Sequence, residues 1–267
     1  MTHSPAPRWD AAQYLRHEGH RTRPFHDLLA RIDPPAAPAR IADLGCGAGN
    51  ATALLAARWP HARITGFDNS PEMLAKAQSH ATACLDFAHA DAATWAPAAS
   101  GTYDLIVSSA LLQWVPGHPA LIPGWLDALT PRGTFALQVP GNYDAPSHTL
   151  LARLRESKRW RGRLSGVGDR TAAVPTPAEY LALLTAHGCE ADVWETTYLQ
   201  LLPGADPVLD WVKGTALRPV LTALADDEEA TAAFTAEYAA LLRRAYPPAP
   251  PGTVFPFRRV FAVGVRR

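Results

Sequence analysis

The sequence has few of the features that mark secreted or membrane-spanning proteins. Its 267 residues include three cysteines, Cys46, Cys84 and Cys189, whose odd number and wide spacing predict neither a disulfide framework nor a cysteine metal site. No apolar stretch approaches the ~20 residues of a membrane-spanning helix, and the opening MTHSPAPRWD lacks the apolar region of a signal peptide. We therefore expect a soluble cytoplasmic protein without a membrane partner.

The sequence also has no excess of positive or negative charge. The 25 lysines and arginines balance 25 aspartates and glutamates, whereas nucleic-acid-binding domains are usually basic, so no nucleic-acid partner is expected. Residues 153–163, RLRESKRWRGR, form a local basic cluster. It is interpreted first as a solvated helix face and second as a basic lid that concentrates an anionic substrate. A nucleic-acid contact is the third choice.

Hydrophobic residues make up 48% of the chain, which is enough for a large core. Apolar strand patterns alternate with helical patterns up to Pro140, and the helix after Ser70 has an N-cap followed by Pro71. The predicted strands are RIADLG, ARITGFD, CLDFAHAD, YDLIVSSA and RGTFALQVP. Such alternation indicates a parallel sheet with right-handed crossovers.

The pattern changes after Pro140. Residues 142–188 and 206–246 are predicted to be helical, residues 190–202 alternate like a strand, and FPFRRVFAVGVRR forms a final strand. A last strand that returns by a hairpin-like connection should insert antiparallel to the others. The predicted fold class is therefore α/β, a Rossmann-like sheet of seven strands with the last one antiparallel.

We expect one domain over residues 1–267, with the segments 142–188 and 206–246 as a helical cap over one end of the sheet. Residues 1–33 are predicted to form an N-terminal helical lid, in which a helix starts at Arg23 with Pro24 in its first turn.

The loop IADLGCGAGN at residues 41–50 predicts a nucleotide-like ligand. A dinucleotide fingerprint counted from Gly45 requires glycine at position 50, where the chain has Asn50. Asp43 would repel a pyrophosphate, but it suits a cation. S-adenosylmethionine (SAM) carries an ammonium and a sulfonium and no phosphate, so SAM is favoured. A dinucleotide-dependent oxidoreductase and a non-catalytic SAM-binding regulator remain as alternatives.

The segment DLGCGAG resembles the first motif of class I SAM-dependent methyltransferases. The resemblance implies that residues at the carboxyl ends of successive strands bind SAM. Those at the methionine end would be Asp43, Gly45, Cys46, Gly47, Ser108 and Ser109. Those around the adenosine would be Asp68 on the ribose hydroxyls, Asn69 and Met73 beside it, and Asp91 with Ala92 at the adenine.

Segments along the whole chain resemble the trans-aconitate 2-methyltransferase family. They are YLRHEGHRTRP, LLQWVPGH, VPGNYDAPSH, WETTY, DWVKGTALRP and FPFRRVF. The resemblance runs from about Trp9 to the end of the chain. It implies methyl transfer from SAM to one carboxylate of the tricarboxylate trans-aconitate, which gives a monomethyl ester. Another small polycarboxylic acid, or another small molecule, is the alternative acceptor.

A tricarboxylate needs fixed cations, and arginine meets a carboxylate with two hydrogen bonds. The candidate substrate-binding residues in the family-like segments are Arg23, Gln113, Trp114, Asn142, His148, Tyr198, Arg218 and Arg259. Arg21 is a further candidate. Arg258 and Arg259 are adjacent on a strand, so at most one of them faces the site.

The acceptor carboxylate is ionised at neutral pH because such acids titrate near pH ~4. No general base, and therefore no catalytic residue, is predicted, and no metal is expected. Catalysis should come from holding the oxygen, methyl carbon and sulfur in line and from excluding water.

Overall fold

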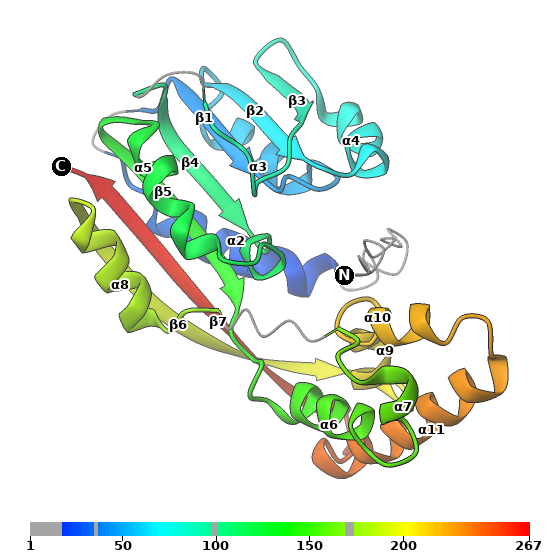
Figure 1. Cartoon of the computed structure of the whole chain (residues 1–267). Coiled ribbons are helices and arrows are strands. Elements are labelled where there is room, and N and C mark those ends of the chain that lie inside the picture. Colours follow the sequence, from blue (N-terminus) through cyan, green and yellow to red (C-terminus); the bar gives the residue numbers. More distant parts are fainter. Residues whose placement is uncertain (1–17, 35–36, 98–100, 169–173) are drawn as a thin grey trace. The chain divides into compact units, whose positions relative to one another are not determined.

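The computed structural model describes residues 18–34, 37–97, 101–168 and 174–267, with side chains from Thr22 onward (Figure 1). The chain divides into two compact units. The larger unit comprises Arg21–Gly141, Ala172–Thr196 and Arg259–Arg267. The smaller unit includes Asn142–Thr171 and Thr197–Arg258. The predicted cap segment 142–188 is thus shared between the two units.

A seven-stranded sheet organises the fold. Its strands are β1 (Arg40–Leu44), β2 (Arg63–Asp68), β3 (Leu85–His89), β4 (Tyr103–Ser109), β5 (Leu129–Pro140), β6 (Cys189–Leu202) and β7 (Thr253–Arg266). They follow the order β3-β2-β1-β4-β5-β7-β6. Strands β1 to β5 pair in parallel, and β7 pairs antiparallel with β5, which confirms the predicted fold class (Figure 1).

Strand β4 is buried on both faces, as its continuous apolar run predicts. Its residues 105–108 are fully buried. The strand order reverses between β1 and β4. In open α/β sheets, ligands bind at such a switch point, outside the carboxyl ends of the strands. The segments that follow β1 and β4 therefore lie where a ligand site is expected.

The helices of the larger unit are α2 (Glu18–Arg31), α3 (Asn50–Arg58), α4 (Pro71–Ala77), α5 (Ile122–Asp127) and α8 (Pro177–Ala186). Short 3-10 turns cover Gln78–His80, Leu112–Trp114 and His118–Ala120. The N-cap of α4 is confirmed, because the Ser70 hydroxyl accepts a hydrogen bond from the Met73 amide at 3.3 Å.

The predicted start of the first helix is wrong. Helix α2 begins at Glu18, and Pro24 lies inside it. Proline removes one intrahelical hydrogen bond. However, the Phe25 and Leu28 side chains, exposed by 2% and 0%, bury one face of the helix. This burial offsets the cost of the proline, because each such side chain contributes about 2 kcal/mol.

The smaller unit is mainly helical. It contains α6 (Pro146–Arg155), α7 (Arg161–Leu164), α9 (Pro207–Lys213), α10 (Arg218–Ala223) and α11 (Glu228–Ala245), together with the 197–202 end of β6 and the 253–258 end of β7. Its core combines aliphatic and aromatic side chains, of which Phe234, Tyr238 and Phe255 have no exposed surface. The Tyr238 hydroxyl donates to the carbonyl oxygen of Ser147, which fixes α11 against α6.

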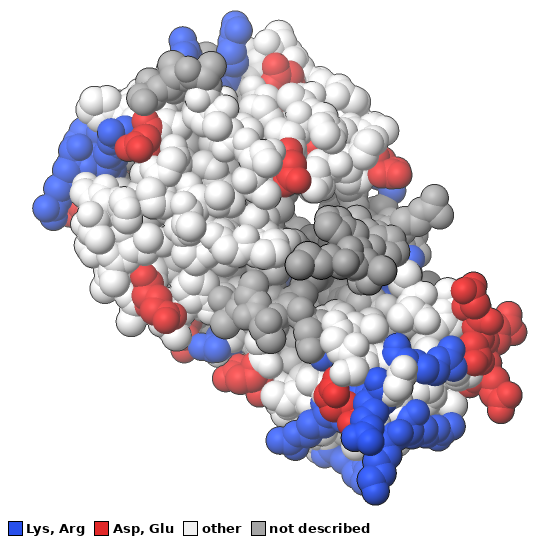
Figure 2. Space-filling model, viewed as in Figure 1, with Lys and Arg blue, Asp and Glu red and all other residues white. Residues whose placement is uncertain are grey.

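Part of the basic cluster at 153–163 is neutralised within this unit. Arg163 pairs with Asp227 at 2.8 Å, and Arg159 pairs with Glu237 of α11. Figure 2 shows basic side chains gathered over the region of α7 and α11, beside acidic ones. These ion pairs agree with a solvated helix face. Within the described residues, no helix combines the length and apolarity that crossing a membrane requires.

Candidate active site

Three glycines shape the loop between β1 and α3. Gly45, Gly47 and Gly49 have φ values of 77°, 56° and 85°, in a region that favours glycine. A Cβ atom on Gly45 would lie 2.7 Å from Cβ of Leu111, whereas a Cβ atom on Gly47 would meet no atom within 4 Å. Gly45 therefore packs tightly against the protein, while Gly47 borders space that is open to a ligand.

The acid at the end of β2 is bonded to this loop. Asp68 Oδ2 accepts a hydrogen bond from the Gly47 amide at 2.9 Å, and Oδ1 accepts one from the Ser70 amide at 2.9 Å. A carboxylate offers about four acceptor positions, so Asp68 retains capacity for ligand hydroxyls. Asn69 follows Asp68 directly, and Met73 lies in the first turn of α4. The structure thus brings the predicted ribose-binding segment to the glycine loop.

Asp43 lies at the base of the loop and is only 1% exposed. Its Oδ2 accepts a hydrogen bond from the Thr52 hydroxyl at 2.7 Å. Burial raises the pKa of Asp43 to about 6, the Thr52 bond opposes the rise, and the charge of Asp68 adds to it. A cation beside such a carboxyl would favour its ionised form. A contact of Asp43 with the ammonium group of a ligand remains a prediction.

Cys46 is a buried thiol in the same loop. Burial raises its pKa above the usual range, so the thiol stays protonated and acts as a small apolar side chain.

Asp91, after β3, is exposed and forms a turn in which its Oδ1 accepts from the Ala93 amide at 2.9 Å. Ala92 is half-buried beside it. A contact of Asp91 with adenine remains a prediction.

Buried polar atoms lie near the end of β4 and in the segment that follows it. The Ser108 hydroxyl is fully buried and finds no hydrogen-bond partner among the described residues. Gln113 donates from Nε2 to the Ala110 carbonyl oxygen at 2.5 Å, but its Oε1 finds no partner in the described part of the chain. Buried polar groups are rarely left without a partner. A contact of these two atoms with a ligand remains a prediction.

The structure adds one residue that sequence reasoning missed. Gln138 on β5 donates from Nε2 to the Ser109 hydroxyl at 2.8 Å, and its Oε1 accepts from Arg259 Nη1 at 2.8 Å. It therefore joins two predicted site residues, one from the cofactor set and one from the substrate set. The available signal was a glutamine within the otherwise apolar run FALQVP at residues 135–140.

The predicted substrate residues of the larger unit differ in their surroundings. Arg23 is exposed on α2, Trp114 is half-buried, and Arg259 is 6% exposed on β7. The side chain of Arg21 is outside the described residues. As expected for neighbours on a strand, Arg258 differs from Arg259, because Arg258 is half-buried and pairs with Asp144 at 3.6 Å.

The remaining predicted substrate residues belong to the smaller unit. They are Asn142, His148, Tyr198 and Arg218. Asn142 is 2% exposed, and neither its Oδ1 nor its Nδ2 finds a hydrogen-bond partner among the described residues. Burial lowers the pKa of His148 to about 4, so its ring is neutral at pH 7. Tyr198 is 4% exposed, and Arg218 begins α10.

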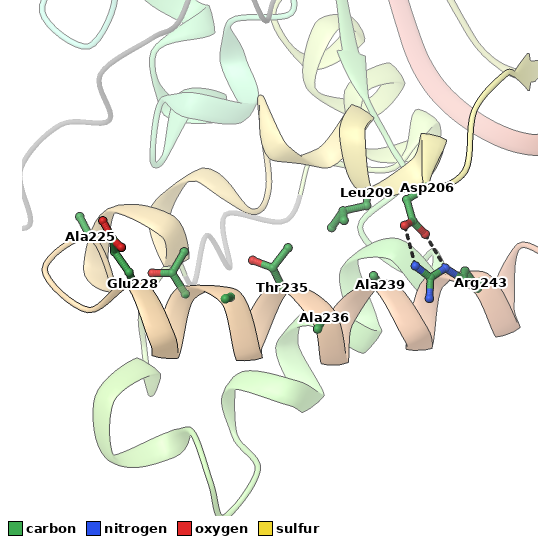
Figure 3. Close-up of a pocket in the computed structure, with 10 residues that line it drawn as sticks. Asp206, Leu209, Ala225, Glu228, Thr235, Ala236, Ala239 and Arg243 are labelled. Atoms are coloured by element: carbon green, nitrogen blue, oxygen red, sulfur yellow. Dashed lines mark hydrogen bonds and ion pairs between the residues drawn. The ribbon is translucent and has the colours of Figure 1, made fainter.

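The pocket in Figure 3 contains none of the predicted site residues. It lies along α11, where Ala236 and Ala239 line it, and the Asp206–Arg243 ion pair lies at one end with a distance of 2.6 Å. Across the described ranges, no group of three or more histidine, cysteine or acidic side chains is arranged to hold a metal ion. The glycine loop and its acids therefore remain the main candidate site.

Comparison with known proteins identifies a methyltransferase domain in this part of the chain. The family described as a methyltransferase domain matches residues 41–133, which include the glycine loop and the segments after β2 to β4. Among solved structures, a Haemonchus contortus phosphoethanolamine N-methyltransferase 2 bound to S-adenosylhomocysteine is similar with a TM-score of 0.54 at 18% identity. It covers 91% of this chain and 52% of that one, and it supports the fold alone.

Curated relatives have a much higher sequence identity to this chain. A trans-aconitate 2-methyltransferase of Streptomyces coelicolor is 64% identical over 97% of this chain and 86% of the relative. One of Streptomyces avermitilis is 64% identical over 96% of both chains. Identity of this extent includes both compact units and the predicted site segments. The chain therefore belongs to the trans-aconitate 2-methyltransferase family.

Proposed function

We propose that this protein transfers a methyl group from SAM to one carboxylate of trans-aconitate, which yields a monomethyl ester and S-adenosylhomocysteine. The observation that carries the proposal is the 64% identity to trans-aconitate 2-methyltransferases across 97% of the chain. The fold and the glycine loop support the methyl donor, and the arginines support an acceptor with several negative charges.

When bound, SAM supplies an electrophilic methyl group on a positively charged sulfur. In the proposed site, ionised Asp43 lies near the ammonium of the methionine moiety, and Asp68 accepts hydrogen bonds from the ribose hydroxyls. Gly47 leaves room for this ligand because a Cβ there would occupy empty space. The buried hydroxyl of Ser108 and Oε1 of Gln113 are available for hydrogen bonds at the methionine end.

The protein has no proton to remove, because the acceptor carboxylate is already ionised at neutral pH. Its task is to hold the reacting oxygen in line with the methyl group, which lowers the entropic part of the barrier. An arginine on the reacting carboxylate would weaken it as a nucleophile. The arginine contacts, including that of Arg259, are therefore proposed to bind the two carboxylates that do not react.

The test is turnover with a panel of acids. Purified protein is incubated with SAM and with trans-aconitate, cis-aconitate, citrate, tricarballylate or a monocarboxylate, and the methyl esters are identified by mass. The proposal expects the highest kcat/KM with trans-aconitate. A higher value with another polycarboxylate would replace the substrate and keep the reaction class. Binding of NAD without binding of S-adenosylhomocysteine would overturn the reaction class as well.

A further inference from the structure

A buried hydrogen bond joins strand β1 to helix α3 in the larger unit. Asp43 is the fourth residue of β1, and Thr52 lies in the first turn of α3. The Thr52 hydroxyl donates to Asp43 Oδ2 at 2.7 Å. Thr52 is 0% exposed and Asp43 is 1% exposed, so bulk water does not compete for this bond. The bond therefore connects the base of the glycine loop directly to the helix that follows the loop.

The main chain of Asp43 is fixed by the sheet. Asp43 is the register partner of Gly66 on β2 and of Val107 on β4. The orientation of its carboxylate therefore depends on the contacts of the two oxygens. Oδ2 is bound by Thr52, whereas Oδ1 accepts no hydrogen bond from a described residue and does not belong to the described polar atoms that are enclosed without a partner. Oδ1 is thus the atom that is left for a ligand.

The Thr52 hydroxyl is dedicated to this carboxylate. In a helix, a threonine hydroxyl often donates to a backbone carbonyl of the preceding turn. A hydroxyl has one proton to donate, and that of Thr52 goes to Asp43, nine positions earlier in the chain. A donor of this kind stabilises a charged carboxylate more than a neutral carboxyl. Thr52 therefore both orients Asp43 and favours its ionised form.

The other influences on Asp43 act in the opposite direction. Burial raises the pKa of Asp43 to about 6, the charge of Asp68 on β2 adds to the rise, and the Thr52 bond opposes it. Cys46 in the glycine loop supplies no positive charge, because burial raises the pKa of its thiol as well. The pKa of Asp43 thus lies close to neutral pH, so a change in the Thr52 bond changes the fraction of Asp43 that is ionised.

We propose that Thr52 is a positioning residue for cofactor binding. Its hydroxyl keeps the Asp43 carboxylate ionised and leaves Oδ1 free to pair with the ammonium group of SAM. Thr52 itself is enclosed and acts only through Asp43. This inference rests on the proposed function, because it requires a ligand that carries an ammonium group.

The decisive variant is Thr52→Val, which keeps the branched shape and removes the hydroxyl. The pKa of Asp43, followed by the carbon resonance of its carboxyl in the ligand-free protein, should rise by about one unit or more. By calorimetry, the Kd for S-adenosylhomocysteine at neutral pH should rise about three- to tenfold. This difference from the wild type should become smaller toward about pH 8.5, where Asp43 of the variant also ionises.

Thr52→Ser is the matched control, because it keeps the hydroxyl and loses one buried methyl group. It should lower the Tm, but the pKa of Asp43 and the Kd should stay close to those of the wild type. In the double variant Thr52→Val/Asp43→Asn, the Kd should not exceed that of Asp43→Asn alone by more than about twofold, because Thr52 acts through the ionised carboxylate. A merely structural role for Thr52 would instead raise the Kd of both Thr52→Ser and Thr52→Val by a factor that does not change with pH.

The outcomes also separate this inference from the proposed function. If the wild type binds S-adenosylhomocysteine and Thr52→Val binds it equally well at neutral pH, the inference is overturned and the function stands. A higher Kd of Thr52→Val without a change in the pKa of Asp43 overturns the inference in the same way. If the wild type binds neither SAM nor S-adenosylhomocysteine, the function fails and the inference fails with it.

Discussion

The carboxylate of Asp68 accepts a hydrogen bond from the backbone amide of Gly47 at 2.9 Å, across 21 positions of the chain. This bond joins the acid after β2 to the glycine loop after β1. The two segments predicted to bind SAM are therefore directly connected, and each can be tested separately.

Substitution of Asp68 should weaken cofactor binding strongly. Asp68→Ala removes the acceptor for Gly47 and Ser70 and the proposed acceptor for the ribose hydroxyls. A charge-assisted hydrogen bond contributes about 1.5–3 kcal/mol, so the Kd for S-adenosylhomocysteine should rise at least about tenfold by calorimetry. Asp86→Asn, an exposed acid on β3, is the matched control and should bind as the wild type does. Equal affinities of Asp68→Ala and wild type would contradict this ligand position.

The first two loop glycines should respond differently to alanine. Gly45→Ala places a Cβ 2.7 Å from Leu111 at a φ of 77°, so it should lower the Tm markedly. Gly47→Ala meets no protein atom within 4 Å, so its destabilisation should be limited to the backbone strain of about 1–2 kcal/mol. Its Cβ occupies the proposed ligand space, however, so S-adenosylhomocysteine affinity should fall. Calorimetry and thermal melts together check this contrast, and an unchanged affinity of Gly47→Ala would contradict it.

Asp43 should make cofactor binding depend on pH. Its pKa in the folded protein, about 6, lies above the ordinary 3.8. Its contribution to stability is therefore fully present below pH 3.8 and is lost as pH rises through about 6. The ligand ammonium favours the ionised form, so affinity for S-adenosylhomocysteine should be constant above about pH 7 and fall by up to tenfold per unit below about pH 6.

The measurement is calorimetry between about pH 5 and pH 8, with Asp43→Asn as the control. The asparagine keeps the shape and cannot ionise, so its affinity should be lower and nearly independent of pH. If the affinity of the wild type for S-adenosylhomocysteine did not change with pH, the Asp43 charge would not contribute to ligand binding.

The buried pair of His118 and Tyr180 should stabilise the larger unit. His118 Nε2 lies 2.7 Å from the Tyr180 hydroxyl, and both residues are at most 1% exposed. Tyr180→Phe leaves a buried imidazole nitrogen without this partner, so the free energy of unfolding should fall by about 1–3 kcal/mol. Chemical denaturation checks this, and the double variant with His118→Phe should lose less than the sum of the two single variants.

The other candidate arginines should affect acceptor binding. Arg23→Ala and Arg218→Ala should mainly raise KM for trans-aconitate, with smaller changes in kcat, because they are proposed to bind carboxylates that do not react. Steady-state kinetics at saturating SAM checks this. If both variants kept wild-type kinetics, the proposed arginine set would have to be replaced.

Strand alternation predicted the sheet, and the order of motifs grouped the residues of the candidate cofactor site. Parallel strands all end at one edge, so acids and glycines that follow them in sequence also meet there in space. That is why Asp43, Gly47 and Asp68 could be grouped in advance. The start of α2 was predicted wrongly because proline is common in the first turn of a helix, whereas Pro24 lies inside this one.

The amino-acid sequence by itself determined the fold class and the residues at the strand ends, because these depend on periodicity and local spacing. The family followed from the identity of the sequence to known relatives. Only the tertiary structure decided that Gln138 meets Arg259, since their bond spans 121 positions and depends on the antiparallel insertion of β7 beside β5. The register of that insertion also decided which of two adjacent arginines became buried. A shift of one residue would have placed Arg258 on the face that Arg259 now occupies, because neighbouring side chains on a strand point to opposite faces.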